Sequence, residues 1–123
     1  MIGFVTLGTN DVARAGRFYD ALLGEIGAKR TAEAVDPIHW ETRSGERMLG
    51  VTSPYDGKPA TSGNGTMIAL AVNDRETVGA LHAKALELGA RDEGGPGPRG
   101  TDGFYGAYCR DLDGNKLAFY VME

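Results

Sequence analysis

The chain repeats a short pattern of residues 63 positions apart. Leu7-Gly8-Thr9-Asn10-Asp11 returns as Leu70-Ala71-Val72-Asn73-Asp74, each time where a strand pattern gives way to a helix pattern. Both helix patterns close on related stretches, Ile26–Arg30 and Leu88–Asp92. Two copies within 123 residues indicate two similar modules, each too small to bury a core alone. We therefore expect one domain of two paired modules, with a ligand pocket between them.

Residue periodicity predicts the order strand, helix, strand, strand, strand in each copy. We expect helices N-capped by Asn10 and Asn73, with Glu76 completing a variant of the capping box. Ser44-Gly45 and Asp111–Gly114 supply the last turn of each module. The expected strands cover 2–8, about 26–34, about 37–43 and about 46–52, then 67–72 and segments near 90–93, 103–110 and 115–122.

A linker over 53–65 separates module one, 1–52, from module two, 66–123. The linker is longer than a plain turn and contains Pro54-Tyr55-Asp56-Gly57-Lys58-Pro59. Loops of this length are often functional. It is either an ordinary crossover between modules or a lid or rim of a pocket.

Composition narrows the partners of the protein. The formal net charge is −4 and the basic residues are scattered, which argues against nucleic acid and mildly favours neutral or cationic ligands. No apolar run is long enough for a membrane span. Met1–Val5 enters a strand pattern at once, so we expect no signal peptide. The single Cys109 cannot form an internal disulfide, and we expect a cytoplasmic protein.

Two segments resemble the vicinal-oxygen-chelate superfamily, which includes glyoxalase I, extradiol dioxygenases, fosfomycin-resistance enzymes and bleomycin-binding proteins. The first is Asn10-Asp11 leading into a helix with Phe18-Tyr19 and Leu22-Leu23-Gly24. The second is the closing hairpin Tyr108–Leu117. With the internal repeat, the likeness covers almost the whole chain. It implies an α+β fold in which two βαβββ modules form a curved, mixed eight-stranded sheet around a cleft. A ferredoxin-like dimeric barrel is the alternative fold.

In metal-dependent members of that superfamily, ligands come from the first and last strands of each module. The matching positions here are Phe4 and Met67 on the first strands, and Leu49 and Ala118 on the last strands. None offers the nitrogen or carboxylate oxygen that a divalent metal needs. We therefore expect neither the family's metal site nor any other cofactor.

The two histidines do not replace that site. His82 lies on a predicted helix beside Leu81 and Ala85, in a position typical of core packing. His39 lies two residues from Glu41 on a predicted strand. This pair either orients a general base or forms part of a solvated strand face.

Apolar and aromatic side chains then define the expected pocket, with Trp40 and Tyr108 as its walls. The resemblance to fosfomycin-resistance enzymes places Tyr108 on the penultimate strand, where those relatives have a tyrosine. Residues 94–103 are rich in glycine and form either a phosphate cradle, a flap that carries Arg99 toward an anionic ligand, or an inert loop. The candidate ligand-binding residues are Phe4, Thr6, Trp40, Leu49, Met67, Arg99, Tyr108, Arg110, Lys116, Ala118 and Tyr120.

Two classes of function fit this pattern. The first is a metal-independent protein that binds a small molecule, as bleomycin-binding proteins do. The second is a glyoxalase-like lyase or isomerase that uses His39, Tyr108 or a carboxylate as acid or base. Binding is favoured because no nucleophile–base pair or carboxylate dyad can be located. We also expect a homodimer, since superfamily members of this size commonly pair and sheet edges need cover.

Overall fold

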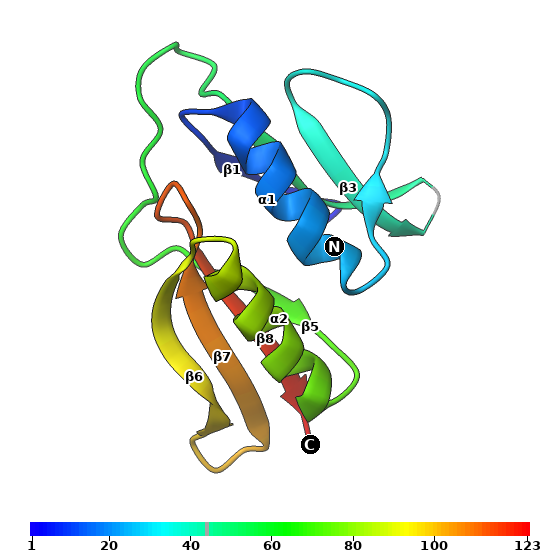
Figure 1. Cartoon of the computed structure of the whole chain (residues 1–123), viewed down its shortest axis with the longest axis vertical. Helices are drawn as coiled ribbons and strands as arrows, with labels where there is room; N and C mark the ends of the chain where they lie inside the picture. The colour runs from blue at the N-terminus through cyan, green and yellow to red at the C-terminus, as the bar shows by residue number, and fades with distance from the viewer. Residues whose placement is uncertain (44) are drawn as a thin grey trace. The chain divides into compact units, whose positions relative to one another are not determined.

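Strands and helices follow the same order in both halves of the chain. The computed structural model describes residues 1–43 and 45–123, and contacts divide it into two units, Met1–Ser62 and Gly63–Glu123. Each unit contains one helix against one face of a four-stranded sheet (Figure 1). The α+β class and the two βαβββ modules are therefore confirmed. No helix among the described residues is long and apolar enough to span a bilayer.

The sheet of the first unit has the order β1-β4-β3-β2. β1 runs parallel to β4, and the other neighbours are antiparallel. The elements are β1 Val5–Gly8, α1 Val12–Gly24, β2 Lys29–Arg30, β3 Ile38–Arg43 and β4 Glu46–Thr52. The turn predicted at Ser44-Gly45 lies partly outside the described residues, because Ser44 is not among them.

The second unit repeats this topology with the order β5-β8-β7-β6. β5 is parallel to β8, and β8-β7-β6 is antiparallel. The elements are β5 Ile68–Ala71, α2 Arg75–Glu87, β6 Arg91–Arg99, β7 Phe104–Arg110 and β8 Lys116–Met122. Gly114 adopts a φ of 86° in the turn before β8, as the sequence predicted.

Both helices begin one residue later than expected. The N-caps are Asp11 and Asp74, whose side chains accept the backbone N–H groups of Arg14 and Thr77. The prediction that Asn10 and Asn73 cap the helices was wrong, because an aspartate follows each asparagine and caps equally well. The predicted role of Glu76 in a capping box was wrong for the same reason. Asn10 instead binds the linker: its Oδ1 accepts the Ala60 N–H at 2.7 Å.

Two predicted strands differ in length from the structure. β2 contains only Lys29 and Arg30, because the chain beyond it forms a loop in which the Asp36 carboxylate binds Thr52 and Ser53. β6 is longer than expected and includes 94–99, which corrects the prediction of a glycine-rich loop or flap there. Glycine and proline are rare in central strands, but β6 lies at a sheet edge, where a missing N–H is tolerated.

Each core lies between a helix and the sheet face that the helix covers. In the first unit, Leu22 and Leu23 of α1 are buried with Leu49 and Val51 of β4. In the second, Val78, Leu81 and Ala85 of α2 are buried with alternate residues of β7 and β8. We call the opposite side of each sheet its distal face.

Trp40 belongs to the core of the first unit. Its side chain has no exposed surface, and its ring lies 5.6 Å from that of Tyr19 on α1. The indole Nε1–H donates to Asp20 Oδ1 at 2.9 Å. Arg30 makes two further hydrogen bonds to the same carboxylate. Burial raises the pKa of Asp20, but the hydrogen bonds from Arg30 and Trp40 outweigh it and leave that pKa below its usual value. This placement corrects the expectation that Trp40 forms a pocket wall.

Candidate functional site

Strand register shows which residues of the two modules are equivalent. Thr6 pairs with Gly50, which pairs with His39. Ala69 pairs with Ala118, which pairs with Tyr108. Gly50 is thus the counterpart of Ala118, and His39 is the counterpart of Tyr108.

Leu49, the residue predicted to match Ala118, is one position out of register. It pairs with Val5 and is fully buried on the helix side of its sheet. The alignment of the two modules was wrong at this position because it equated the turn at residue 45 of the first module with a longer turn of the second module, which is closed by Asp111 and Gly114. Gly50 supplies no metal ligand either, so the chemical argument from these positions is unchanged.

Three aromatic rings stack on the distal face of the second unit. The ring of Phe104 is nearly parallel to that of Tyr120, at 5.0 Å and 5°, and to that of Tyr108, at 6.5 Å and 12°. All three residues are half-buried and come from the adjacent strands β7 and β8. Phe104 and Tyr108 also line a pocket, so part of this aromatic cluster is accessible to a planar molecule.

Two cations lie beside Tyr108, which is at one end of this stack. Arg99 Cζ and Lys116 Nζ each lie 5.3 Å from the centre of the Tyr108 ring. Arg99 comes from the end of β6 and Lys116 from the start of β8, the two strands on either side of β7. Both distances are within the range of a cation–π interaction.

An open pocket of about 490 Å³ lies beside these side chains. Its volume is within the range typical of small-molecule sites. The lining residues are Met67, Arg99, Gly100, Thr101, Asp102, Phe104 and Tyr108. We call this pocket, with Lys116 and Tyr120, the β7 site.

Two glycines allow the large side chains of the β7 site to approach the sheet. A Cβ atom at Gly106 would lie 2.6 Å from Phe104 Cε1, so the Phe104 ring occupies the space above that glycine. A Cβ atom at Gly94 would lie 3.2 Å from both Arg99 Nη2 and Tyr108 Cδ2. The glycines of β6 and β7 therefore position the ring stack and the arginine.

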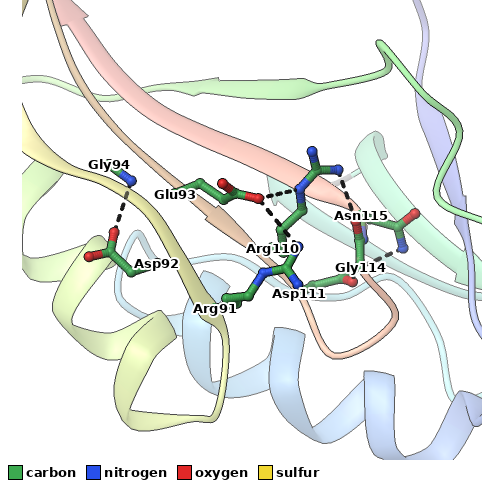
Figure 2. A network of polar contacts seen from close by, with 8 residues as sticks. All are labelled: Arg91, Asp92, Glu93, Gly94, Arg110, Asp111, Gly114 and Asn115. Carbon is green, nitrogen blue, oxygen red and sulfur yellow. Dashed lines mark hydrogen bonds and ion pairs between the residues drawn. The ribbon is translucent and has the colours of Figure 1, made fainter.

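Arg110 is part of a polar network that joins β6, β7 and the turn before β8. Figure 2 shows Glu93 bound by Arg110, whose Nε donates to Glu93 Oε1 at 2.8 Å and whose Nη1 donates to the Gly114 carbonyl at 3.2 Å. The hydrogen bond from Arg110 holds the pKa of Glu93 below its usual value. Arg110 was predicted to orient a ligand; the structure places it in this network, outside the pocket lining.

The remaining predicted residues occupy different surroundings. Met67 is 41% exposed at the edge of the β7 site. Ala118 pairs with Tyr108 on the distal face but has no exposed surface of its own. Phe4 and Thr6 belong to the first unit, where Phe4 is 47% exposed.

The distal face of the first unit carries a smaller cluster. The rings of Phe4 and His39 meet edge to face at 5.2 Å, and Arg47 lies over Phe4. Burial and the charge of Arg47 lower the pKa of His39. A register shift follows Trp40, and the Glu41 carboxylate accepts the Gly45 N–H, so the His39–Glu41 pair suggested by the sequence is not formed.

His82 and Cys109 are structural in character. His82 is buried on α2, as the sequence predicted, and its Nε2 lies 3.0 Å from Asp92 Oδ1. Burial, with the charges of Asp111 and Asp92, raises the pKa of Cys109 to about 12. Among the described residues, no group of three or more His, Cys, Asp or Glu side chains could hold a metal ion.

Sequence reasoning missed Phe104, the ring at the centre of the stack. The information was present, because Phe104 lies four residues before Tyr108 and strand alternation places both on one face. What the sequence lacked was the strand pairing that brings Tyr120 beside them.

Comparison with known proteins gives a consistent family assignment. A model of the Glyoxalase/Bleomycin resistance protein/Dioxygenase superfamily matches residues 1–119. A glyoxalase/bleomycin resistance protein from Albidiferax ferrireducens T118 is 35% identical, with a TM-score of 0.87 over 100% of this chain and 99% of that one. No curated protein gives a significant match.

Two other solved structures are more distant. Hypothetical protein SA1046 from S. aureus is 28% identical, with a TM-score of 0.73 over 98% of this chain and 92% of that one. A lactoylglutathione lyase from Agrobacterium tumefaciens is 19% identical, with a TM-score of 0.69 over the same shares of the two chains. The second likeness supports the fold alone.

Proposed function

Because the chain belongs to the Glyoxalase/Bleomycin resistance protein/Dioxygenase superfamily, a fold that hosts many chemistries, we propose its function from the β7 site. The protein binds a small planar organic molecule there without a metal ion. The observation that carries this proposal is the stack of Phe104, Tyr108 and Tyr120 beside an open pocket.

The residue types at the family's ligand positions support metal independence. Phe4, Gly50, Met67 and Ala118 provide no nitrogen or carboxylate oxygen. A thioether such as that of Met67 is a soft ligand, unsuited to Mg²⁺ or Zn²⁺. Elemental analysis of protein dialysed without chelator should give well under one metal per chain. Stoichiometric Zn, Ni, Mn or Fe would contradict this part of the proposal.

The binding proposal can be tested by calorimetric titration with two pairs of aryl compounds, cinnamate with cinnamamide and phenylacetate with phenylacetamide. At least one should bind saturably. Phe104→Leu should weaken that binding by about tenfold, since ring stacking contributes about 0.5–1.5 kcal/mol beyond buried area. Tyr55→Leu, which changes a fully exposed ring in the first unit, is the matched control and should have no effect.

Two results would refute the binding proposal. One is the absence of saturable binding for all four compounds at millimolar concentration. The other is equal affinity of wild-type and Phe104→Leu protein for whichever compound binds.

A lyase or isomerase is the alternative function, favoured by one observation. His39 has a lowered pKa and therefore carries a neutral imidazole, able to accept a proton, at neutral pH. An enzyme of this type should catalyse exchange of a carbon-bound hydrogen of a bound ligand with deuterium from solvent, followed by proton NMR. His39→Gln should abolish that exchange. No exchange in wild-type protein would exclude proton-transfer chemistry on the ligand tested.

We also propose that the protein is a cytoplasmic homodimer. Sheet edges such as β2 and β6 leave backbone groups that association can cover. Sedimentation at micromolar concentration should give twice the mass of the chain, and a monomer would contradict this expectation.

A further inference from the structure

We propose that the ligand of the β7 site is an aromatic carboxylic acid. Its ring lies against Phe104 and Tyr108, and its carboxylate is bound by Arg99 and Lys116. This inference rests on the proposed binding function and goes beyond it by assigning the charge and chemical class of the ligand.

Arg99 and Lys116 differ from other cations of the second unit in how their charges are paired. Arg75 is bound to Glu123, and Arg110 to Glu93. Arg99 and Lys116, in contrast, have no ion pair with a carboxylate in the part of the chain that the structure describes. Two cations beside one tyrosine without a carboxylate partner are unexpected in a protein with a net charge of −4. They produce a local positive potential that the overall charge does not reveal.

The acidic groups nearby do not cancel this potential. Asp102 is the one carboxylate lining the pocket, and its Oδ1 accepts the Phe104 N–H at 3.3 Å. Glu93 is already bound by Arg110 and by Arg91. The β7 site therefore contains two cations, Arg99 in the pocket lining and Lys116 beside Tyr108, against one exposed carboxylate. It favours an anion although the whole chain is acidic.

Arg99 is held in position before a ligand arrives. Its Nη2 donates to the Gly95 carbonyl at 2.6 Å and its Nη1 to the Pro98 carbonyl at 3.3 Å. A guanidinium has five N–H donors in a planar fork, so further donors remain for a carboxylate. Because the arginine is already ordered, less conformational entropy is lost on binding.

The β7 site suits a carboxylate better than a phosphate. Phosphate sites in proteins commonly use several free backbone N–H groups at a glycine-rich turn or a helix N-terminus. Gly94, Gly95 and Gly97 lie in strand β6, and the Gly94 N–H is already donated to Asp92 Oδ1 at 2.9 Å. Of the glycines in the turn that follows β6, only Gly100 lines the pocket. A side-chain fork and an ammonium group beside a ring suit a carboxylate attached to an aromatic group.

The test compares each acid of the panel with its amide, which has nearly the same shape without the charge. Calorimetric titration of wild-type protein should give at least tenfold tighter binding of cinnamate than of cinnamamide, and the same order for phenylacetate and phenylacetamide. Arg99→Gln and Lys116→Gln should each reduce the preference for the acid severalfold and leave affinity for the amide unchanged. Lys58→Gln removes the same charge from the first unit and should change nothing.

The outcomes separate this inference from the function on which it rests. Equal or tighter binding of the amides would overturn the assignment of an acid while the binding function stands. A preference for acids that persists in both Gln variants would overturn the roles of Arg99 and Lys116. If no compound of the panel binds, the proposed function fails and this inference fails with it. Far-UV circular dichroism of each variant verifies that a lost affinity does not result from unfolding.

Discussion

Trp40→Phe should destabilise the protein without weakening ligand binding. The substitution removes the hydrogen bond from the indole Nε1 to Asp20 and leaves a smaller ring at a site with no exposed surface. A hydrogen bond to a charged group contributes about 1.5–3 kcal/mol when shielded from water. The Asp20 side chain is 44% exposed. Water therefore replaces part of the lost bond, and about 1 kcal/mol remains.

The smaller ring adds a second cost. Conservative truncations of buried side chains destabilise proteins by about 0.5–1.5 kcal/mol, because the surrounding residues fill the void only in part. The total loss in the free energy of unfolding is thus about 2 kcal/mol. Removing the partner as well, in a Trp40→Phe/Asp20→Ala cycle, should give a coupling of about 1 kcal/mol for the indole–carboxylate hydrogen bond.

Urea unfolding followed by far-UV circular dichroism measures these differences, because the substitution removes the only tryptophan. Tyr55→Phe, at an exposed ring, is the control and should stay within about 0.5 kcal/mol of wild type. A free energy of unfolding unchanged in Trp40→Phe would refute the structural role. A tenfold loss of aryl-acid affinity in Trp40→Phe would also contradict the account, because Trp40 would then belong to the binding site.

Three further predictions concern single side chains. Gly106→Ala should displace the Phe104 ring and weaken aryl-acid binding about tenfold by calorimetry. Gly79→Ala, at a position with open space around it, is the control and should not weaken binding. Equal affinities of wild-type and Gly106→Ala protein would contradict the packing described. The pKa of His39 is lowered in the folded protein, so below about pH 6.5 the unfolded chain takes up the proton first. Stability should fall as pH decreases through this window and level off below the folded-state pKa, a dependence that urea unfolding should find reduced in His39→Gln. Cys109, with a pKa of about 12, should resist alkylation by iodoacetamide in native protein at mildly alkaline pH and react after denaturation, and rapid labelling of the native thiol would show that it is accessible.

Most of the fold could be predicted from the sequence because each module alternates apolar residues with the period of its elements. The strand expected over 46–52 has those bounds in the structure, and the repeat correctly indicated two equivalent halves. Errors in the predicted elements occurred where the residue types favour one structure and the position in the sheet permits another. In β6, glycine and proline suggested a loop, whereas an edge strand accepts them because one of its sides needs no partner.

The candidate site was less predictable because the alternation of side chains along a strand is compatible with either face of the sheet being covered by the helix. Alternation groups residues on a common face but does not say which face the helix covers. Tyr108, Lys116 and Tyr120 fell on the face away from the helix, as expected. Trp40 was assigned to that face as well, but the hydrogen bond to Asp20 and the contact with Tyr19 place it under α1.

The pairings of charged residues could not be predicted from the sequence. Arg99 and Arg110 are both arginines near one end of a strand in the second unit. The structure separates them, because Glu93 binds Arg110 while Arg99 donates only to backbone carbonyls. Strand register brings Glu93 to Arg110, and register could not be read from residue spacing once β6 contained two irregularities.

The most direct test of the central claim is an amide proton–nitrogen NMR titration of uniformly nitrogen-15-labelled protein with cinnamate. If the β7 site binds the acid, saturable shift changes should be largest for Gly94, Arg99, Gly106 and Tyr108, and the same titration of Phe104→Leu should shift them less at each concentration. Largest changes at Phe4, Gly45 and Arg47, which line a separate pocket in the first unit, would contradict the account. So would linear shifts without saturation for both cinnamate and phenylacetate at millimolar concentration.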